Sequence, residues 1–178
     1  NAIDPERRAA ELGYASEEVV TIASLIQVKS PVRYMPKVSR VIYNRLDDPT
    51  GPTVGKLQID ATVNYALGRK LGVAITTEET KVDSPYNTYQ NVGLPPGPIE
   101  APGLEAMRAA GEPAEGDWLF YVTVNLRTGE TKFTPDYDEF LQFKAEFKQY
   151  CETSEACSAS AMTPTFARCA VLGDPIAH

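Results

Sequence analysis

The chain has 178 residues, of which 43% are hydrophobic and 23% are charged, so it can bury the core of one globular domain but not of two full-sized ones. Acidic residues outnumber basic residues 24 to 17, and the resulting net charge of −7 argues against a nucleic-acid partner. The only histidine is His178, which excludes a histidine-based triad or metal site in residues 1–150, and we expect no metal and no cofactor.

Hydrophobic spacing predicts three helices in the first part of the chain. A short helix is expected over residues 5–13, because this segment begins with proline and ends with glycine. A second is expected over residues 16–29, because glutamates fill its first turn and the residue before Pro31 avoids helical geometry. One face of this helix is predicted to be buried through Val19, Ile22, Leu25 and Ile26. The third helix begins at Pro36, and Arg45 lies on its apolar face.

The remaining elements mix helices with one hairpin and predict the α+β class, with several short helices, a small β-hairpin and a long C-terminal amphipathic helix. In chain order they are a helix from Asp60 to about Leu67, a loop over 94–103 with four prolines, a short helix over 104–110, strands over 117–124 and 131–134, and a helix over 136–150. The long helix has an apolar side made of Tyr137, Phe140, Leu141, Phe143, Phe147 and Tyr150.

The end of the chain differs in composition from the rest. Serine, alanine, cysteine and threonine dominate after Thr153, which predicts a folded domain over 1–153 and a disordered tail over 154–178. All three cysteines lie in the last 28 residues of the chain. A disulfide between Cys151 and Cys157 is one hypothesis for them, and unpaired thiols are the other.

Two loops invite a chemical interpretation. The loop over 94–103 is stiff and long, and such loops in compact domains often carry function. The segment SPYNTY combines aromatic rings with amides and hydroxyls, a mixture that suits the apolar faces and hydroxyl groups of sugars. The structural alternative is that Asn87 and Thr88 only satisfy the backbone of a turn.

Six segments in a fixed order carry a family resemblance. They are ASLIQVKS, PKVSRVIYNRL, LQIDATVNYALG, DSPYNTY, GLPPGPIEAPG, and GDWLFYVT together with TGETKFT. Over about residues 15–150 this order resembles the catalytic region of the YceG-like endolytic murein transglycosylases, known as MltG. Within that family, the sequences of the segments are most similar to those of the actinobacterial branch. The pairing of YNTY with GLPPGPI, after YNRL, is the most specific part of the resemblance.

The resemblance implies an activity, partners and a location. Members of this family are lyases that cleave glycan strands internally at the MurNAc–GlcNAc bond and leave 1,6-anhydro-MurNAc ends. The implied partners are peptidoglycan glycan strands and the peptidoglycan synthases. The implied location is the cell membrane, with the catalytic domain facing the cell wall. Membrane contact is expected only through a single N-terminal anchor, which precedes the catalytic region together with a LysM-like domain and is not in this chain.

The resemblance places the catalytic position at Lys29, where the family has a glutamate. A lysine is a weaker proton donor than glutamate by about six pKa units, and it supplies no anion to stabilise an oxocarbenium-like transition state. We therefore expect the chain as written to be inactive or impaired, and the alternative is an inactive glycan-binding or scaffolding homologue. The candidate substitute carboxylates are Asp60, Asp83 and Glu100, of which Asp60 is the best, although it could instead be a helix N-cap. Lys29 could instead serve as a favourable cation at a helix C-terminus.

The other cleft residues follow from matches to the family motifs. The residues implied to bind substrate are Asn44, Arg45, Asp60, Asn87, Thr88 and Tyr89. For Arg45 the structural alternative is an ion pair with Asp60 or Asp83. A second resemblance concerns residues 167–178, ARCAVLGDPIAH, which are similar to the start of a shikimate dehydrogenase and suggest a fusion to a neighbouring reading frame.

Overall fold

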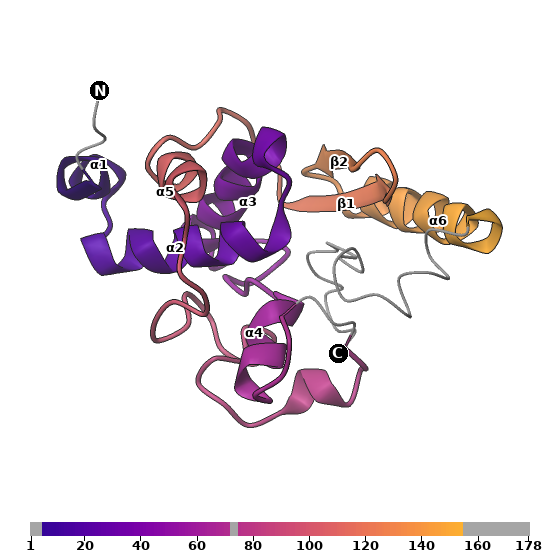
Figure 1. The fold of residues 1–178 in the computed structure, drawn as a ribbon, viewed down its shortest axis with the longest axis horizontal. Helices are drawn as coiled ribbons and strands as arrows, with labels where there is room; N and C mark the ends of the chain where they lie inside the picture. The colour runs from indigo at the N-terminus through magenta and orange to yellow at the C-terminus, as the bar shows by residue number, and fades with distance from the viewer. Residues whose placement is uncertain (1–4, 72–74, 155–178) are drawn as a thin grey trace.

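The computed structural model describes residues 5–71 and 75–154 and confirms the α+β class (Figure 1). The first helices are α1 (Pro5–Leu12), α2 (Ser16–Lys29), α3 (Met35–Asp47) and α4 (Asp60–Ala66). They are followed by α5 (Leu104–Gly111), the antiparallel strands β1 (Phe120–Asn125) and β2 (Glu130–Thr134), and α6 (Tyr137–Thr153). Two short 3₁₀ helices, which periodicity did not predict, are η1 (Val32–Tyr34) and η2 (Glu79–Lys81). No helix within the described ranges is long and apolar enough to span a membrane.

The second helix, α2, forms the centre of the larger core. It contacts α1, α3, α4 and α5, which lie around it in Figure 1. The sequence predicted one buried face, but α2 is buried on nearly all sides, because Thr21, Ala23, Ser24 and Val28 are enclosed along with its large apolar residues. Small residues allow the neighbouring segments to approach the helix closely, so α2 serves as a fixed axis for the site at its C-terminal end.

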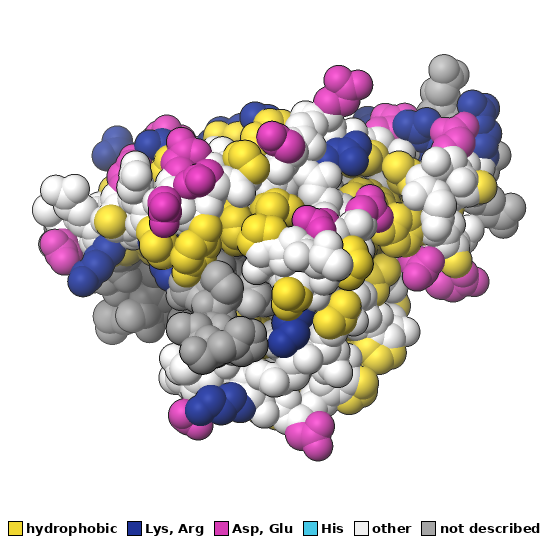
Figure 2. Space-filling model, turned by 180° about the vertical axis from the view of Figure 1, so that it is seen from behind, with side chains coloured by type: hydrophobic (Ala, Val, Ile, Leu, Met, Phe, Trp, Pro, Cys, Tyr) yellow, Lys and Arg dark blue, Asp and Glu magenta, His cyan; other side chains and the backbone are white. Residues whose placement is uncertain are grey.

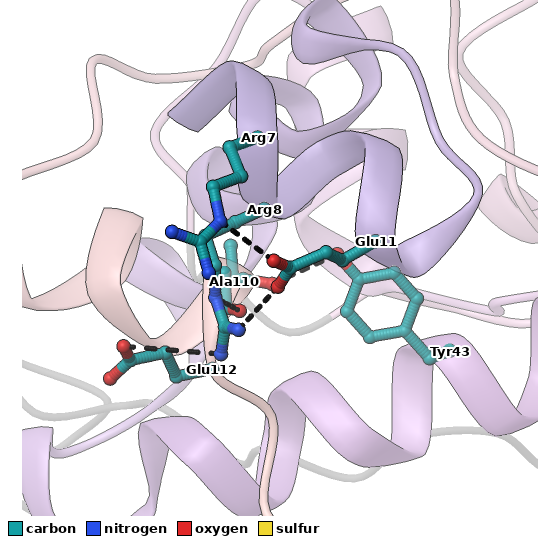
Figure 3. Close-up of polar contacts among 7 residues, drawn as sticks. Arg7, Arg8, Glu11, Tyr43, Ala110 and Glu112 are labelled. Atoms are coloured by element: carbon teal, nitrogen blue, oxygen red, sulfur yellow. Dashed lines mark hydrogen bonds and ion pairs between the residues drawn. The ribbon is translucent and has the colours of Figure 1, made fainter. Parts of the chain in front are cut away.

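Side chains from α1 and α3 bind the C-terminal end of α5 (Figure 3). Arg8 donates to the carbonyl oxygen of Gly111 at 3.1 Å, and the Tyr43 hydroxyl donates to the carbonyl oxygen of Ala110 at 2.9 Å. These carbonyls belong to the last turn of a helix, where no intrahelical donor is available. Arg8 also pairs with Glu11 at 2.6 Å, and hydrogen bonds from Arg7 and Arg8 lower the pKa of Glu11. These contacts fix α1 against the main body.

The hairpin and α6 form a second, smaller core. Phe120, Val122 and Val124 of β1 are buried with Phe140 of α6. The prediction that Leu141 lies on the buried side is wrong, because this residue is one position around the helix from Phe140 and is 41% exposed. The Asp136 carboxylate caps α6 by accepting a hydrogen bond from the Glu139 N–H at 2.8 Å.

The first strand begins later than the sequence predicted. We expected it from residue 117, but β1 begins at Phe120. The carbonyl oxygens of Trp118 and Leu119 instead accept hydrogen bonds from side chains of α3, which removes them from a strand ladder. The segment before the hairpin is therefore fixed to α3.

Several predictions for the end of the chain lie outside the described residues. These are the disorder of the tail beyond residue 154, the similarity of residues 167–178 to a shikimate dehydrogenase, and the role of Cys157. Cys151 is disulfide-bonded, and its pairing with Cys157 remains a prediction.

Candidate active site

The proline-rich loop lies along α2 and leads toward the C-terminal end of that helix. The Ser24 hydroxyl accepts a hydrogen bond from the backbone N–H of Ile99 at 3.1 Å. One turn later, the Gln27 side-chain oxygen accepts one from the N–H of Gly103 at 3.0 Å. The two bonds fix the direction of the loop toward Lys29, the last residue of α2. Sequence reasoning assigned Gln27 no role, and only the fold shows that it holds the loop.

The Asn87 side chain is engaged by the protein itself. It is fully buried, and its amide donates to the carbonyl oxygens of Thr80 and Val82 at 2.9 and 2.8 Å. Its side-chain oxygen accepts a hydrogen bond from the backbone N–H of Tyr89 at 3.0 Å. This is the turn-stabilising role considered from the sequence, and a contact of Asn87 with substrate remains a prediction.

Thr88 joins the SPYNTY turn to the start of α4. Its hydroxyl accepts a hydrogen bond from the Ile59 N–H at 2.8 Å and lies 2.8 Å from the hydroxyl of Thr62. Its carbonyl oxygen accepts one from the Gln58 N–H at 3.1 Å. The expectation that Asp60 caps α4 is wrong, because the N-cap is Ile59 and no side chain caps this helix. The Asp60 side chain has a different partner.

That partner is Tyr89. The Tyr89 hydroxyl donates to Oδ1 of Asp60 at 2.5 Å. Tyr89 is buried with 7% of its surface exposed, whereas Asp60 is half-buried. The structure therefore brings together two of the predicted site residues, with the carboxylate on the accessible side. The other candidate carboxylates, Asp83 and Glu100, are exposed.

Arg45 is a fully buried cation next to this pair. Its Nε donates to the carbonyl oxygen of Leu119 at 2.7 Å, and its Nη1 donates to that of Leu57 at 3.0 Å. The guanidinium lies 5.2 Å from the centre of the Phe120 ring. Burial lowers the pKa of Arg45 to about 10, so the side chain remains charged at neutral pH. These bonds show a buried structural role for Arg45, and substrate binding by it remains a prediction.

Asn44 points to a different part of the fold. Its amide donates to the carbonyl oxygens of Gly116 and Trp118 at 3.1 and 2.9 Å. It therefore fixes the segment before β1, and substrate binding by Asn44 remains a prediction.

Two site residues were missed by sequence reasoning. The Tyr121 hydroxyl is buried and has no hydrogen-bond partner among the described residues. Burial and the charge of Asp60 raise the pKa of Tyr121 while Arg45 lowers it, which shows that both charges act on this hydroxyl. Gln58 is buried and has a left-handed backbone with φ of 53°, which is uncommon for a residue other than glycine. Both residues lie in segments that carry the family resemblance, Gln58 in LQIDATVNYALG and Tyr121 in GDWLFYVT, but no local pattern distinguishes them from their neighbours there.

The acidic side chains of the candidate site do not form a metal-binding group among the described residues. In the part of the chain that the structure describes, no three side chains of His, Cys, Asp or Glu are grouped to hold a metal ion. On the reverse face of the molecule, acidic and basic side chains are interspersed around a band of hydrophobic ones (Figure 2). Mixed charge of this kind provides no strong field of one sign on that face.

Comparisons with known proteins agree with one another. The sequence model of the YceG-like family matches residues 1–146. An endolytic murein transglycosylase from Bacillus subtilis (strain 168) is 34% identical over 131 residues, which are 73% of this chain and 34% of that protein. One from Streptococcus pneumoniae serotype 2 (strain D39) is 38% identical over 113 residues, 59% of this chain and 19% of that protein.

A solved structure shares the fold. The crystal structure of a putative YceG-like protein from Listeria monocytogenes superposes with a TM-score of 0.68 at 34% identity, over 76% of this chain and 42% of that one. The chain spans about a third or less of the length of the two curated relatives.

Proposed function

Because the chain belongs to the YceG-like family, we propose that it is the catalytic part of an endolytic peptidoglycan lytic transglycosylase. The observation that carries this proposal is the 34% identity to the Bacillus subtilis endolytic murein transglycosylase over 73% of the chain. The proposed reaction is cleavage of MurNAc–GlcNAc bonds inside nascent glycan strands, with 1,6-anhydro-MurNAc ends as the products.

The proposed chemistry needs one carboxyl group that both donates and accepts a proton. The acid protonates the glycosidic oxygen as its bond to the anomeric carbon breaks. The C6 hydroxyl of the same MurNAc then attacks the anomeric carbon, and its proton passes to the carboxylate that the first step left behind. No water is consumed, and the second carboxylate of ordinary glycoside hydrolases is not required.

Lys29 separates this chain from that chemistry. It is the last residue of α2. The resemblance of its segment to the family places it where the catalytic glutamate is expected. A lysine has an ordinary pKa of about 10.4 and glutamate of about 4.3, so lysine retains its proton where glutamate can donate one. We propose that the chain retains the fold and the cleft of a transglycosylase but is impaired in cleavage.

The alternative function is an inactive glycan-binding or scaffolding homologue at the cell-wall synthesis machinery. Lys29 is the observation that favours it, since binding a glycan needs the cleft but not the acid. In both proposals the partners are glycan strands and peptidoglycan synthases. The proposed location is the extracytoplasmic side of the cell membrane, reached through an anchor outside this chain.

A paired digestion tests the proposed function. Uncrosslinked glycan strands are incubated with the chain as written, with Lys29→Glu, and with Lys29→Gln as a neutral control. The products are analysed by mass spectrometry for new 1,6-anhydro-MurNAc ends. We expect such ends from Lys29→Glu and few or none from the other two. If Lys29→Glu folds and binds glycan but produces no anhydro ends, the transglycosylase proposal is wrong and the scaffolding alternative is favoured.

A further inference from the structure

The carboxylate of Asp60 is held in one position yet remains accessible. Tyr89 donates to its Oδ1 at 2.5 Å, and no further hydrogen bond or ion pair to this carboxylate occurs within residues 5–71 and 75–154. Tyr89 is buried, so its ring has little freedom to move, whereas Asp60 is half-buried. The arrangement leaves Oδ2 of Asp60 available to a ligand.

The backbone before Asp60 is held in an unfavourable conformation. Gln58 has φ of 53°, a region that costs about 1 kcal/mol or more for a residue with a side chain. Three contacts of Thr88 secure this conformation, through the N–H groups of Gln58 and Ile59 and the hydroxyl of Thr62. Such strain persists only where the surrounding structure enforces it, and it is concentrated at functional sites.

The buried side of the carboxylate is polar and positively charged. Arg45 is fully buried there, and its charge interacts with the hydroxyls of Tyr89 and Tyr121. The Tyr121 hydroxyl, which the Asp60 charge also reaches, is buried without a hydrogen-bond partner among the described residues. The groups on the buried side are therefore polar, and the Tyr89 hydroxyl is the one that bonds the Asp60 carboxylate and fixes its direction, as a preorganised binding group requires.

From these contacts we propose that Asp60 Oδ2 accepts a hydrogen bond from a hydroxyl group of the bound glycan, and that Tyr89 is the positioning residue that aims it. This inference rests on the proposed function. An ionised carboxylate only accepts hydrogen bonds, and sugar hydroxyls are donors, so the chemistry is complementary. The role of Tyr89 therefore differs from the substrate contact that the family resemblance implied, because its hydroxyl acts through Asp60.

A double-mutant cycle on glycan affinity tests this pairing. The dissociation constant of a soluble, uncrosslinked GlcNAc–MurNAc oligosaccharide is measured by calorimetry for the chain as written, Asp60→Asn, Tyr89→Phe and the double variant. We expect about tenfold weaker binding for Asp60→Asn, the effect of losing one charge-assisted hydrogen bond. Tyr89→Phe should weaken binding several-fold. The double variant should bind no more weakly than Asp60→Asn. Once the carboxylate is absent, loss of the Tyr89 hydroxyl can no longer change its position.

The control is Tyr14→Phe, for which we expect unchanged affinity, because it removes a tyrosine hydroxyl that donates to a different carboxylate, Oδ1 of Asp47, at 2.8 Å. A merely structural Tyr89 would lower the thermal midpoint and add its loss of affinity to that of Asp60→Asn. Additive losses, or unchanged affinity in Asp60→Asn, would overturn this inference even if Lys29→Glu produces anhydro ends. A chain with no measurable glycan affinity would overturn both this inference and the proposed cleft. The same cycle on kcat/KM in the Lys29→Glu background should show the same non-additivity.

Discussion

Arg45 belongs to the YNRL motif, and its contacts in the structure stabilise the fold. Its guanidinium bonds the carbonyl oxygens of Leu57 and Leu119, which belong to two segments on either side of it. Leu119 is 74 positions away in the sequence, so no local pattern could predict this contact. The sequence did place Arg45 on the buried face of its helix, and burial of a charge requires that its donors be satisfied.

Arg45→Lys should destabilise the protein by about 2 kcal/mol, because one ammonium cannot serve both carbonyl oxygens and leaves a buried acceptor unpaired. The matched control is Arg40→Lys, since the half-buried Arg40 donates a hydrogen bond to the single carbonyl of Ala114. We expect a loss below about 1 kcal/mol there. Urea unfolding gives both values. Equal losses of unfolding free energy in the two variants would show that the carbonyls of Leu57 and Leu119 do not need a guanidinium as their donor.

At the scale of elements, local sequence signals predicted which helices and strands exist more reliably than the residues at which they begin and end. The helix over residues 16–29 was predicted with its observed bounds, because glutamates at one end and Ser30–Pro31 at the other are local signals. The start of β1 was not predicted, since the carbonyls of Trp118 and Leu119 are bound by α3. The full burial of α2 also depends on elements from distant parts of the sequence.

The hairpin and α6 depend on one aromatic contact. The Phe120 and Phe140 rings are stacked with their centres 5.1 Å apart in the smaller core. Phe140→Ala should therefore cost about 3–5 kcal/mol of unfolding free energy.

The adjacent Leu141→Ala is the control, because Leu141 is 41% exposed and its loss should cost about 0.5 kcal/mol or less. Chemical denaturation of both variants measures the difference. A cost for Leu141→Ala as large as that for Phe140→Ala would contradict the orientation of α6.

In the candidate site, the sequence predicted a turn but not the contacts that its side chains make. Asn87, Thr88 and Tyr89 were singled out correctly as a polar and aromatic turn, and the fold brings Tyr89 to Asp60. Whether each side chain faces solvent or the backbone depends on tertiary contacts. Thr88 meets Ile59 and Thr62 from 26 or more positions away, and no spacing rule captures such a contact.

At the scale of the whole molecule, buried tyrosines set the response to alkali. Burial raises the pKa values of Tyr14, Tyr43 and Tyr121 above the ordinary value of 10.0. The folded state therefore keeps three protons that the unfolded state releases above about pH 10. Arg45 acts in the opposite direction, since its pKa is lowered from 12.5 to about 10. The three tyrosines outnumber the one arginine, so the free energy of unfolding should fall as the pH rises above about 10.

Urea unfolding should show this loss of stability when it is measured at about pH 8, 10 and 11, which lie on both sides of the ordinary tyrosine pKa. Tyr43→Phe should reduce the slope of unfolding free energy against pH, because it removes one of the three titrating groups. Tyr65→Phe is the control, since Tyr65 is 41% exposed, and its slope should match the parent chain. A stability that stays constant up to pH 11 would contradict the burial of these hydroxyls.

We propose that one side chain at the end of α2, Lys29, separates this chain from an active lytic transglycosylase. The most direct measurement is the number of 1,6-anhydro-MurNAc ends produced per glycan strand by Lys29→Glu relative to the chain as written. We predict an increase of at least 100-fold, in line with the contribution of a positioned general acid–base group. Equal and non-zero numbers of anhydro ends from the two proteins would contradict this proposal and direct attention to Asp60 as the proton donor.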